Sequence, residues 1–208
     1  MTLHLKPATE LAERVLLPSN PHRALGIAQH LLEGPRMFNH AHGLWGYTGI
    51  AADGAPLTIQ STGVGGPSAA IVTEELIGLG ARRLVRVGSG RALADDLGPG
   101  DLVAAERVVS GDGASAALGA NGALGSDPEL LERLVAAGAR ACTVVTTDLF
   151  YDPREAAAGD AAVADLEAGA VLQVAARHGV PAACVLAVSA DEEPALRAGE
   201  AGYAAVSP

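Results

Sequence analysis

Apolar residues along the chain alternate between short continuous runs and helical spacing, and each change of period predicts a new element. The runs, which have the length of buried strands, lie at 14–18, 83–89, 101–110, 141–148 and 181–190. Segments with helical spacing lie at 21–32, 66–79, 127–137 and 166–178. Because strands and helices alternate, we expect an α/β fold of three layers, α/β/α, with a central mixed sheet flanked by helices.

Two further apolar runs, 43–51 and 55–63, flank the turn sequence Ala-Asp-Gly and predict a β-hairpin. Small residues dominate 111–125 and 153–162, which we interpret as loops. The chain shows neither an internal repeat nor a change of composition that would divide it. We therefore expect one domain over residues 1–208.

Composition narrows the class of protein. The net charge is −10, with one lysine and thirteen arginines, which argues against a nucleic-acid partner. The sequence has no apolar run of membrane-spanning length and its first residues lack a signal-peptide pattern, so we expect a soluble protein with no membrane partner. Cys142 and Cys184 stand inside apolar runs, which favours core thiols over a disulfide or a metal pair, and a cytoplasmic location.

The stretch QSTGVGGPSAAIVTEELIGLG, residues 60–80, places several glycines and a proline between a predicted strand and a predicted helix. Glycine lets the backbone turn with positive φ or approach another group closely, and proline suits the first turn of a helix. A small ligand is one candidate for the group that this loop approaches.

Arg86 is a charged residue in the middle of the apolar strand RLVRVGS, and a buried charge needs an anionic partner. A carboxylate of the protein and a bound ligand both meet that need. Position favours the ligand, because Ser89 follows at the carboxyl end of the strand, where open α/β sheets bind ligands. The segment PSNPHR, residues 18–23, is a second candidate anion site, since Arg23 stands in the first turn of a predicted helix. The alternative there is an ordinary helix cap.

Five sequence blocks follow one another in the order known from one enzyme family. LPSNPHR resembles its phosphate loop "PGDPxR", STGVGGPS resembles "STGIGGPS", and RVGS is similar to "RVGS" or "RIGT". TTDLFYDP resembles "ADLFY", and ADLEAGAV resembles "VEMEAAG". Together these blocks, which span roughly residues 4 to 191, make the chain resemble the nucleoside phosphorylases that include the hexameric purine and uridine phosphorylases.

The resemblance implies a phosphate site in which phosphate is a co-substrate, with no other cofactor and no metal. The residues implied for it are Ser19, Arg23, Arg86, Ser89 and His42, the last in place of an arginine that the family supplies from a neighbouring subunit. The residues implied for the nucleoside are His4, Phe150, Tyr151, Asp165, Leu166 and Glu167.

Roles within that nucleoside site also follow from the resemblance. Glu167 would accept hydrogen bonds from the ribose 2′ and 3′ hydroxyls, Leu166 would lie beneath the sugar, and Phe150 and Tyr151 would pack on the base. His4 would reach the ribose of the neighbouring subunit, which implies a homo-oligomer built from dimers, a hexamer by analogy with the family.

Each of these residues also has a purely structural reading. Glu167 has the position of a helix cap or surface carboxylate, and scarce aromatics such as Phe150 and Tyr151 are usually core. His4 has the position of a frayed terminal residue. The remaining histidines that we interpret as surface or packing residues are His22, His30, His40 and His178.

Several site positions depart from the family pattern. Ser19 and Asn20 replace a glycine and an aspartate of the phosphate loop. Arg91 replaces a glycine, where a long cation either enters the base pocket or pushes its loop outward. Asp165 is one methylene shorter than the family glutamate, and Leu166 replaces a methionine.

The aspartate that protonates the departing base in the family's purine enzymes aligns with Ala190, so Asp191, one residue later, is the candidate catalytic acid beside the catalytic Arg86. Arg197 is the candidate for the arginine that partners this acid. We expect the chain to end at GYAAVSP without the long terminal helix of the family.

The resemblance implies cleavage of the N-glycosidic bond of a nucleoside by phosphate, giving free base and ribose 1-phosphate. DLFY favours a purine nucleoside, whereas STGVGGPS is typical of the uridine enzymes. The alternatives are a nucleoside hydrolase, a uridine-type phosphorylase, or a non-catalytic ligand-binding homologue that has lost the acid.

Overall fold

A large mixed sheet organises the computed structural model, which describes residues 2–120, 124–151, 159–188 and 191–208. The strands lie in the order β2-β3-β4-β1-β5-β10-β7-β8-β9-β6. Their bounds are β1 Arg14–Leu17, β2 Leu32–Asn39, β3 Gly46–Ala51, β4 Pro56–Gln60, β5 Arg83–Ser89, β6 Arg91–Ala92, β7 Leu102–Ser110, β8 Arg140–Thr146, β9 Val163–Asp165 and β10 Ala182–Ala187. Neighbours β4-β1-β5-β10 run parallel, whereas β10 and β7 are antiparallel, so the predicted mixed sheet is confirmed.

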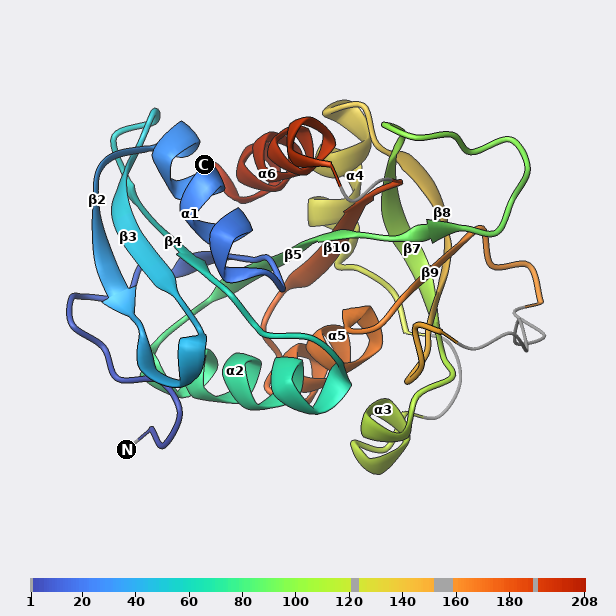
Figure 1. The fold of residues 1–208 in the computed structure, drawn as a ribbon, viewed down its shortest axis with the longest axis horizontal. Coiled ribbons are helices and arrows are strands. Elements are labelled where there is room, and N and C mark those ends of the chain that lie inside the picture. Colours follow the sequence, from blue (N-terminus) through green and yellow to red (C-terminus); the bar gives the residue numbers. More distant parts are fainter. Residues whose placement is uncertain (1, 121–123, 152–158, 189–190) are drawn as a thin grey trace.

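Helices cover both faces of the sheet, which gives the three predicted layers (Figure 1). One face carries α1 Pro21–Leu31, α4 Pro128–Ala136 and α6 Glu192–Val206, and the other carries α2 Gly66–Leu79, α3 Gly113–Ala117 and α5 Ala168–Arg177. The 3₁₀ turn η1 Ala41–Gly43 precedes β3. None of the described helices is both long and apolar enough to cross a membrane.

The side chains of the central strands point alternately into two hydrophobic cores, one on each face of the sheet. In β1, Val15 and Leu17 pack toward α2 and α5, whereas Leu16 packs toward α1 and α6. In β5, Leu84 belongs to the first core and Val85 to the second. Since successive side chains of a strand point to opposite faces, Arg86 has the same orientation as Leu84 and points to the α5 side of the sheet.

The second half of the sheet closes on itself at Gly90. Strand β6 continues the chain of β5 after this one residue, yet it pairs with β9 rather than with a neighbour of β5, with Arg91 opposite Ala164. A Cβ atom on Gly90 would lie 2.3 Å from Cγ1 of Val163, so only glycine allows this close crossing. The closure brings β9 and the start of α5 next to the carboxyl end of β5.

Most predicted elements are confirmed, and the missed ones are short or lack an apolar signal. The predicted hairpin is the antiparallel pair β3 and β4. Strand β2 was not predicted, because its middle is exposed at the sheet edge and contains a bulge beside Pro35. Helix α3 lies inside the predicted loop 111–125. The predicted loop 153–162 lies largely outside the described residues.

The prediction that the chain ends without a long terminal helix is wrong, because α6 covers Glu192–Val206. Its buried face consists of small residues, such as Ala198, and rests on β5 and β10. At Gly202, a Cβ atom would lie 2.9 Å from Cγ2 of Val87. Alanine and glycine give almost no hydrophobic periodicity, although they let a helix approach a sheet closely. The pattern of apolar residues therefore could not reveal this helix.

The two cysteines are free thiols, as predicted. Cys184 is buried in the core on the α5 side of β10, and Cys142 is half-buried in β8. Burial raises the pKa of Cys142 to about 11, so its thiol is protonated and unreactive at neutral pH.

We predict that Gly66→Ala destabilises the protein by roughly 1–3 kcal/mol, because a Cβ atom at the start of α2 would lie 2.8 Å from Cβ of Ala114. The matched control is Gly78→Ala in the same helix, where no atom lies within 4 Å of the new Cβ. That substitution should stabilise by about 0.5–1 kcal/mol. Urea unfolding of both variants measures the two effects, and equal changes would show that the contact at Gly66 does not matter.

Candidate active site

A cavity of about 200 Å³ lies where β5, β6, β9 and the start of α5 meet. Seven of the predicted site residues line it, namely Ser19, Arg86, Ser89, Phe150, Asp165, Leu166 and Glu167. Arg91, Val64 and Leu149 are further lining residues. Each of the five sequence blocks therefore contributes at least one lining residue, and the contribution of STGVGGPS is Val64.

Arg86 is the buried centre of this site, with 1% of its surface exposed. Its Nε donates to Oδ2 of Asp165 at 3.2 Å, and its Nη2 donates to Oε2 of Glu167. Its Nη1 faces the carbonyl oxygen of Leu17 at 3.5 Å, next to the phosphate-loop segment. The sequence position favoured a ligand as the anionic partner of Arg86, but in the structure two protein carboxylates fill that role. Burial alone would lower the pKa of Arg86, but the negative charges of Glu167 and Asp165 raise it above its usual value, so the guanidinium stays charged.

Asp165 is a fully enclosed carboxylate that fixes the start of α5. Its Oδ1 accepts from Oγ1 of Thr146 at 2.8 Å, and its Oδ2 accepts from the backbone N–H of Ala168 at 2.8 Å as well as from Arg86. None of its side-chain surface is exposed. Although Asp165 lines the cavity, its carboxylate is occupied by protein groups and positions Arg86.

Glu167 explains the glycine-rich loop of the sequence. The backbone N–H of Gly65, which has a positive φ of 89°, donates to Oε1 of Glu167 at 2.8 Å. Glu167 occupies the N-cap position of α5, as the structural alternative predicted, but its side chain is buried, with 4% of the residue exposed, and makes no capping hydrogen bond. The loop therefore approaches this carboxylate, and it holds one oxygen of Glu167 while Arg86 holds the other.

The segment 18–23, which resembles the phosphate loop, leads into the capped helix α1. Arg23 in the first turn of this helix approaches Ser89 at the cavity. Asn20 caps α1 by accepting from the backbone N–H of His22 at 2.8 Å, so the cap reading of this segment is confirmed. Nη1 of Arg23 lies 3.4 Å from Oγ of Ser89. Burial and the charge of Arg86 both lower the pKa of Arg23. Two guanidinium groups near one another favour an anion between them.

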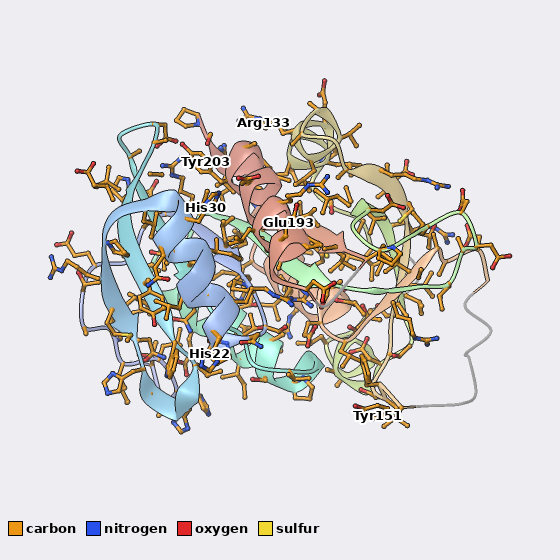
Figure 2. The ribbon with its side chains drawn as sticks, turned by 45° about the horizontal axis from the view of Figure 1, so that its top comes forward. His22, His30, Arg133, Tyr151, Glu193 and Tyr203 are labelled. Carbon is orange, nitrogen blue, oxygen red and sulfur yellow. The ribbon has the colours of Figure 1, made fainter. Side chains whose placement is uncertain are left out.

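The two aromatic residues of TTDLFYDP are exposed rather than core. Phe150 lines the cavity and is 63% exposed, and Tyr151 is 92% exposed. Their rings meet edge to face with centroids 4.9 Å apart. Figure 2 shows Tyr151 at the periphery of the molecule. The faces of this pair are available to a ligand or to another subunit.

His4 and His42 lie together, but they do not line this cavity. Their ring centroids are 5.3 Å apart, and His42 has a left-handed backbone with φ of 56°. His4 is not frayed, because Glu75 accepts the backbone N–H groups of Leu3, His4 and Leu5 and contacts Nδ1 of His4 at 3.0 Å.

Glu75 is the residue that the sequence analysis missed. Burial alone would raise its pKa, but the N–H groups of Leu5, His4 and Leu3 and the His4 side chain lower it to about 2. Glu75 is therefore a charged anchor for His4 at neutral pH. It stands beside Glu74 on a predicted helix, where the sequence has no signal to separate an anchor from a solvated face.

Asp191 and Arg197, the predicted acid and its partner, do not meet in this cavity. Asp191 is exposed at the N-terminus of α6, and it is not among the described residues that line the cavity. Arg197 donates to the carbonyl oxygen of Gly100 at 3.2 Å, on another side of the molecule. Ala190, with which the family acid aligns, lies outside the described residues. The catalytic role of Asp191 stays a prediction.

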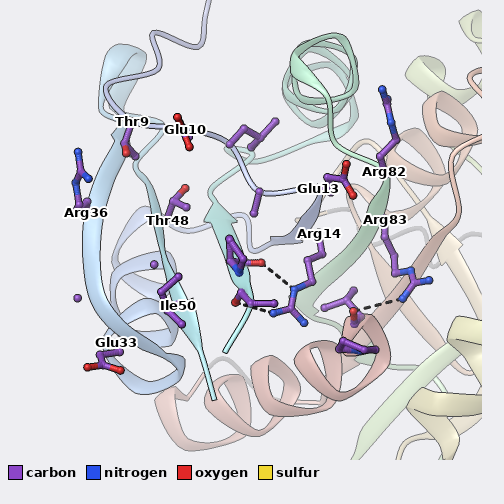
Figure 3. A pocket seen from close by; sticks show the side chains of 18 of the residues that line it. Thr9, Glu10, Glu13, Arg14, Glu33, Arg36, Thr48, Ile50, Arg82 and Arg83 are labelled. Atoms are coloured by element: carbon purple, nitrogen blue, oxygen red, sulfur yellow. Dashed lines mark hydrogen bonds between the residues drawn. The ribbon is translucent and has the colours of Figure 1, made fainter. Parts of the chain in front are cut away.

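A larger hollow of about 870 Å³ lies at the opposite edge of the sheet (Figure 3). Its wall includes Arg14 and Arg83, the first residues of β1 and β5, so it opens at the amino ends of these strands. Arg14 is held there by Asp53 and by the carbonyl oxygen of Pro56. Because ligands of α/β sheets bind beyond the carboxyl ends of the strands, the smaller cavity is the better candidate for the active site, although this hollow is larger.

Comparisons with known proteins show the family of the chain. The family model of the Phosphorylase superfamily matches residues 13–205. The chain belongs to this superfamily. A DeoD-type purine nucleoside phosphorylase of Caldanaerobacter subterraneus is 34% identical over 206 residues, which cover 91% of this chain and 88% of that protein. The corresponding protein of Oceanobacillus iheyensis is 32% identical over 195 residues, which cover 86% of this chain and 83% of that protein.

A solved structure gives the same family. The uridine phosphorylase of Vibrio fischeri superposes with a TM-score of 0.81 at 25% identity, covering 94% of this chain and 90% of that one. The family resemblance and the fold that it implied are thereby confirmed. The relatives include both purine and uridine enzymes by name, so the comparisons do not choose between the bases.

We predict that Arg86→Ala lowers the free energy of unfolding by about 3–5 kcal/mol, because it leaves Asp165 and Glu167 as buried charges without their cation. The control is Arg140→Ala, whose ion pair with Asp96 is largely exposed and should change stability little. Chemical denaturation of both variants at neutral pH gives the comparison. A stability of Arg86→Ala equal to that of the control would show that the two carboxylates are neutral or hydrated.

Proposed function

We propose that this protein is a nucleoside phosphorylase, a pentosyltransferase that cleaves a nucleoside with phosphate to give the free base and ribose 1-phosphate. The observation that carries the proposal is that the guanidinium of Arg86 and the buried carboxylate of Glu167 meet at one cavity, beside Ser89, which the guanidinium of Arg23 approaches. The two cations would form charge-assisted hydrogen bonds with a phosphate dianion, and the carboxylate would accept hydrogen bonds from hydroxyl groups.

Phosphate would bind between Arg23, Ser89 and Nη1 of Arg86, next to the backbone at Ser19. Arginine forks hold two oxygens of a phosphate at once, which fixes its orientation. From there a phosphate oxygen attacks C1′ on the face opposite to the base. The transition state carries positive charge on the ribose, which the phosphate and Glu167 stabilise.

The nucleoside would occupy the rest of the cavity. Glu167 would accept hydrogen bonds from the ribose 2′ and 3′ hydroxyls with the lone pairs that Gly65 and Arg86 leave available. Leu166 would lie beneath the sugar, and the exposed ring of Phe150 would stack on the base. A purine is the base that we propose, because DLFY is typical of the purine enzymes.

Incubation of the purified protein with inosine, adenosine and uridine, each with and without phosphate, tests the proposal. We expect base and ribose 1-phosphate only when phosphate is present. Phosphate-independent release of base would instead identify a hydrolase, and binding without turnover would identify a non-catalytic homologue.

We predict that Arg23→Ala raises the KM for phosphate by roughly 10- to 100-fold, since a hydrogen bond to a charged group contributes about 1.5–3 kcal/mol. The control is Arg36→Ala, an exposed residue at the opposite hollow, which should leave the KM unchanged. Initial rates at varied phosphate concentration measure both. Identical KM values in the two variants would remove Arg23 from the phosphate site.

We also propose that His4 and His42 serve the site of a neighbouring subunit, so that the protein is at least a dimer. They form one pair outside the cavity of their own chain, and Glu75 holds His4 firmly. The exposed aromatic pair at the cavity mouth offers apolar surface for that contact. We place the protein in the reducing cytoplasm, in agreement with its free thiols, and in purine salvage.

Subunit mixing tests the shared site. His4→Ala and Glu167→Gln should each be nearly inactive, but their equimolar mixture should regain about one quarter of wild-type activity, because half of the dimers are mixed and each mixed dimer has one intact site. Dissociation and joint reassociation of the two variants, followed by the phosphorolysis assay, measures this. A mixture as inactive as its parts, or a monomer in light scattering, would contradict the proposal.

A further inference from the structure

Arg91 lines the cavity and takes no part in the phosphate and ribose contacts proposed above. We propose that Arg91 reads the base, and that it selects nucleosides whose base presents two neighbouring hydrogen-bond acceptors, as a 6-oxopurine does with O6 and N7. This inference rests on the proposed function and names the substrate class of that same site.

The fold fixes the backbone of Arg91 at the cavity. Arg91 begins β6 and pairs with Ala164 of β9. Ala164 lies three residues before Glu167 in the sequence. Gly90 in front of it is packed too tightly for any side chain. Arg91 therefore cannot shift along the strand without breaking the closure of the sheet.

Arg91 also lies close to the residues proposed for phosphate. Ser89 and Arg91 both line the cavity, and they are two residues apart in sequence, so their Cα atoms are separated by no more than about 7 Å. Thr147, Leu149 and Phe150 line the same cavity as Arg91, and the base would stack on the ring of Phe150. A base leaving C1′ on the side opposite to phosphate would meet this group of residues.

The chemistry of guanidinium decides which base fits. Arginine has five N–H donors and no acceptor, and it stays charged at any pH that proteins tolerate. The O6 and N7 atoms of a 6-oxopurine accept two parallel N–H groups, which is the usual pairing of arginine with guanine. A 6-aminopurine places an N–H₂ donor beside N7, so one donor of Arg91 would face another donor.

The same cation can support the departing base. As the phosphate oxygen bonds to C1′, the bond from C1′ to the base nitrogen breaks and its electron pair stays on the base. Delocalisation places part of that negative charge on N7 and O6, next to Arg91. The base then takes the proton that hydrogen phosphate gives up, so charge and atoms balance. Asp191 is not required for this step.

Three substitutions of Arg91 separate these roles. Arg91→Gln offers one donor and one acceptor, the pattern that matches N7 and N6–H₂ of a 6-aminopurine. Arg91→Lys keeps the charge and loses the planar fork, and Arg91→Ala loses both. Arg140→Gln removes a charge from an exposed pair elsewhere and is the control. Asp191→Asn, in the same assays, measures the competing acid.

We expect wild-type protein to favour inosine over adenosine in kcat/KM by roughly 10- to 100-fold, the discrimination that one bidentate base contact provides. Arg91→Gln should reverse the preference, and Arg140→Gln should leave it intact. Arg91→Lys should lose discrimination but keep more kcat on inosine than Arg91→Ala. Asp191→Asn should change kcat on inosine by less than Arg91→Ala does.

Calorimetric binding of hypoxanthine and adenine to wild type and Arg91→Gln gives a readout that does not depend on turnover. The proposal is overturned if the preference between these bases is the same in both proteins, if uridine is preferred over inosine, or if Asp191→Asn abolishes turnover while Arg91→Ala does not. Absence of phosphorolysis with every nucleoside would contradict the proposed function instead, and the binding preference would still decide the role of Arg91.

Discussion

The buried guanidinium of Arg86 joins parts of the chain that are far apart in sequence, and the geometry of the cavity depends on it. It holds Asp165 at the end of β9 and Glu167 at the start of α5, while Gly65 binds Glu167 from the other side. Each of these groups is desolvated, and such an arrangement is tolerable only when the charges and hydrogen bonds satisfy one another. A change in any member therefore alters the surroundings of the other members and the shape of the cavity.

Glycine serves this arrangement in two different ways. At Gly65, a positive φ directs a backbone N–H at a carboxylate, whereas at Gly90 the absence of a side chain allows β5 to cross into β6. Gly65 thereby holds one oxygen of Glu167 at the start of α5, and Gly90 lets the chain pass from β5 into β6, which pairs with β9.

The sequence predicted the sheet, its helices and most of the cavity, because strong periodicity and family motifs coincide there. It favoured a ligand as the partner of Arg86 and missed the two carboxylates, since a ligand and a protein carboxylate satisfy a buried cation equally well. It missed α6, whose buried face is alanine and glycine, and β2, whose exposed middle has no alternation. It also missed Glu75, because a carboxylate on a helix shows its role only when the N-terminal segment is seen folded against it.

The run from β5 into β6 also limits the distance between the two proposed substrate contacts. Arg86 and Arg91 are five residues apart on one chain segment, and five residues cannot span more than about 18 Å even when fully extended. The covalent chain therefore sets an upper limit on the distance between the two arginines to which we assign the phosphate and the base. Under these assignments, a change in the length of this segment would alter the phosphate and base contacts together.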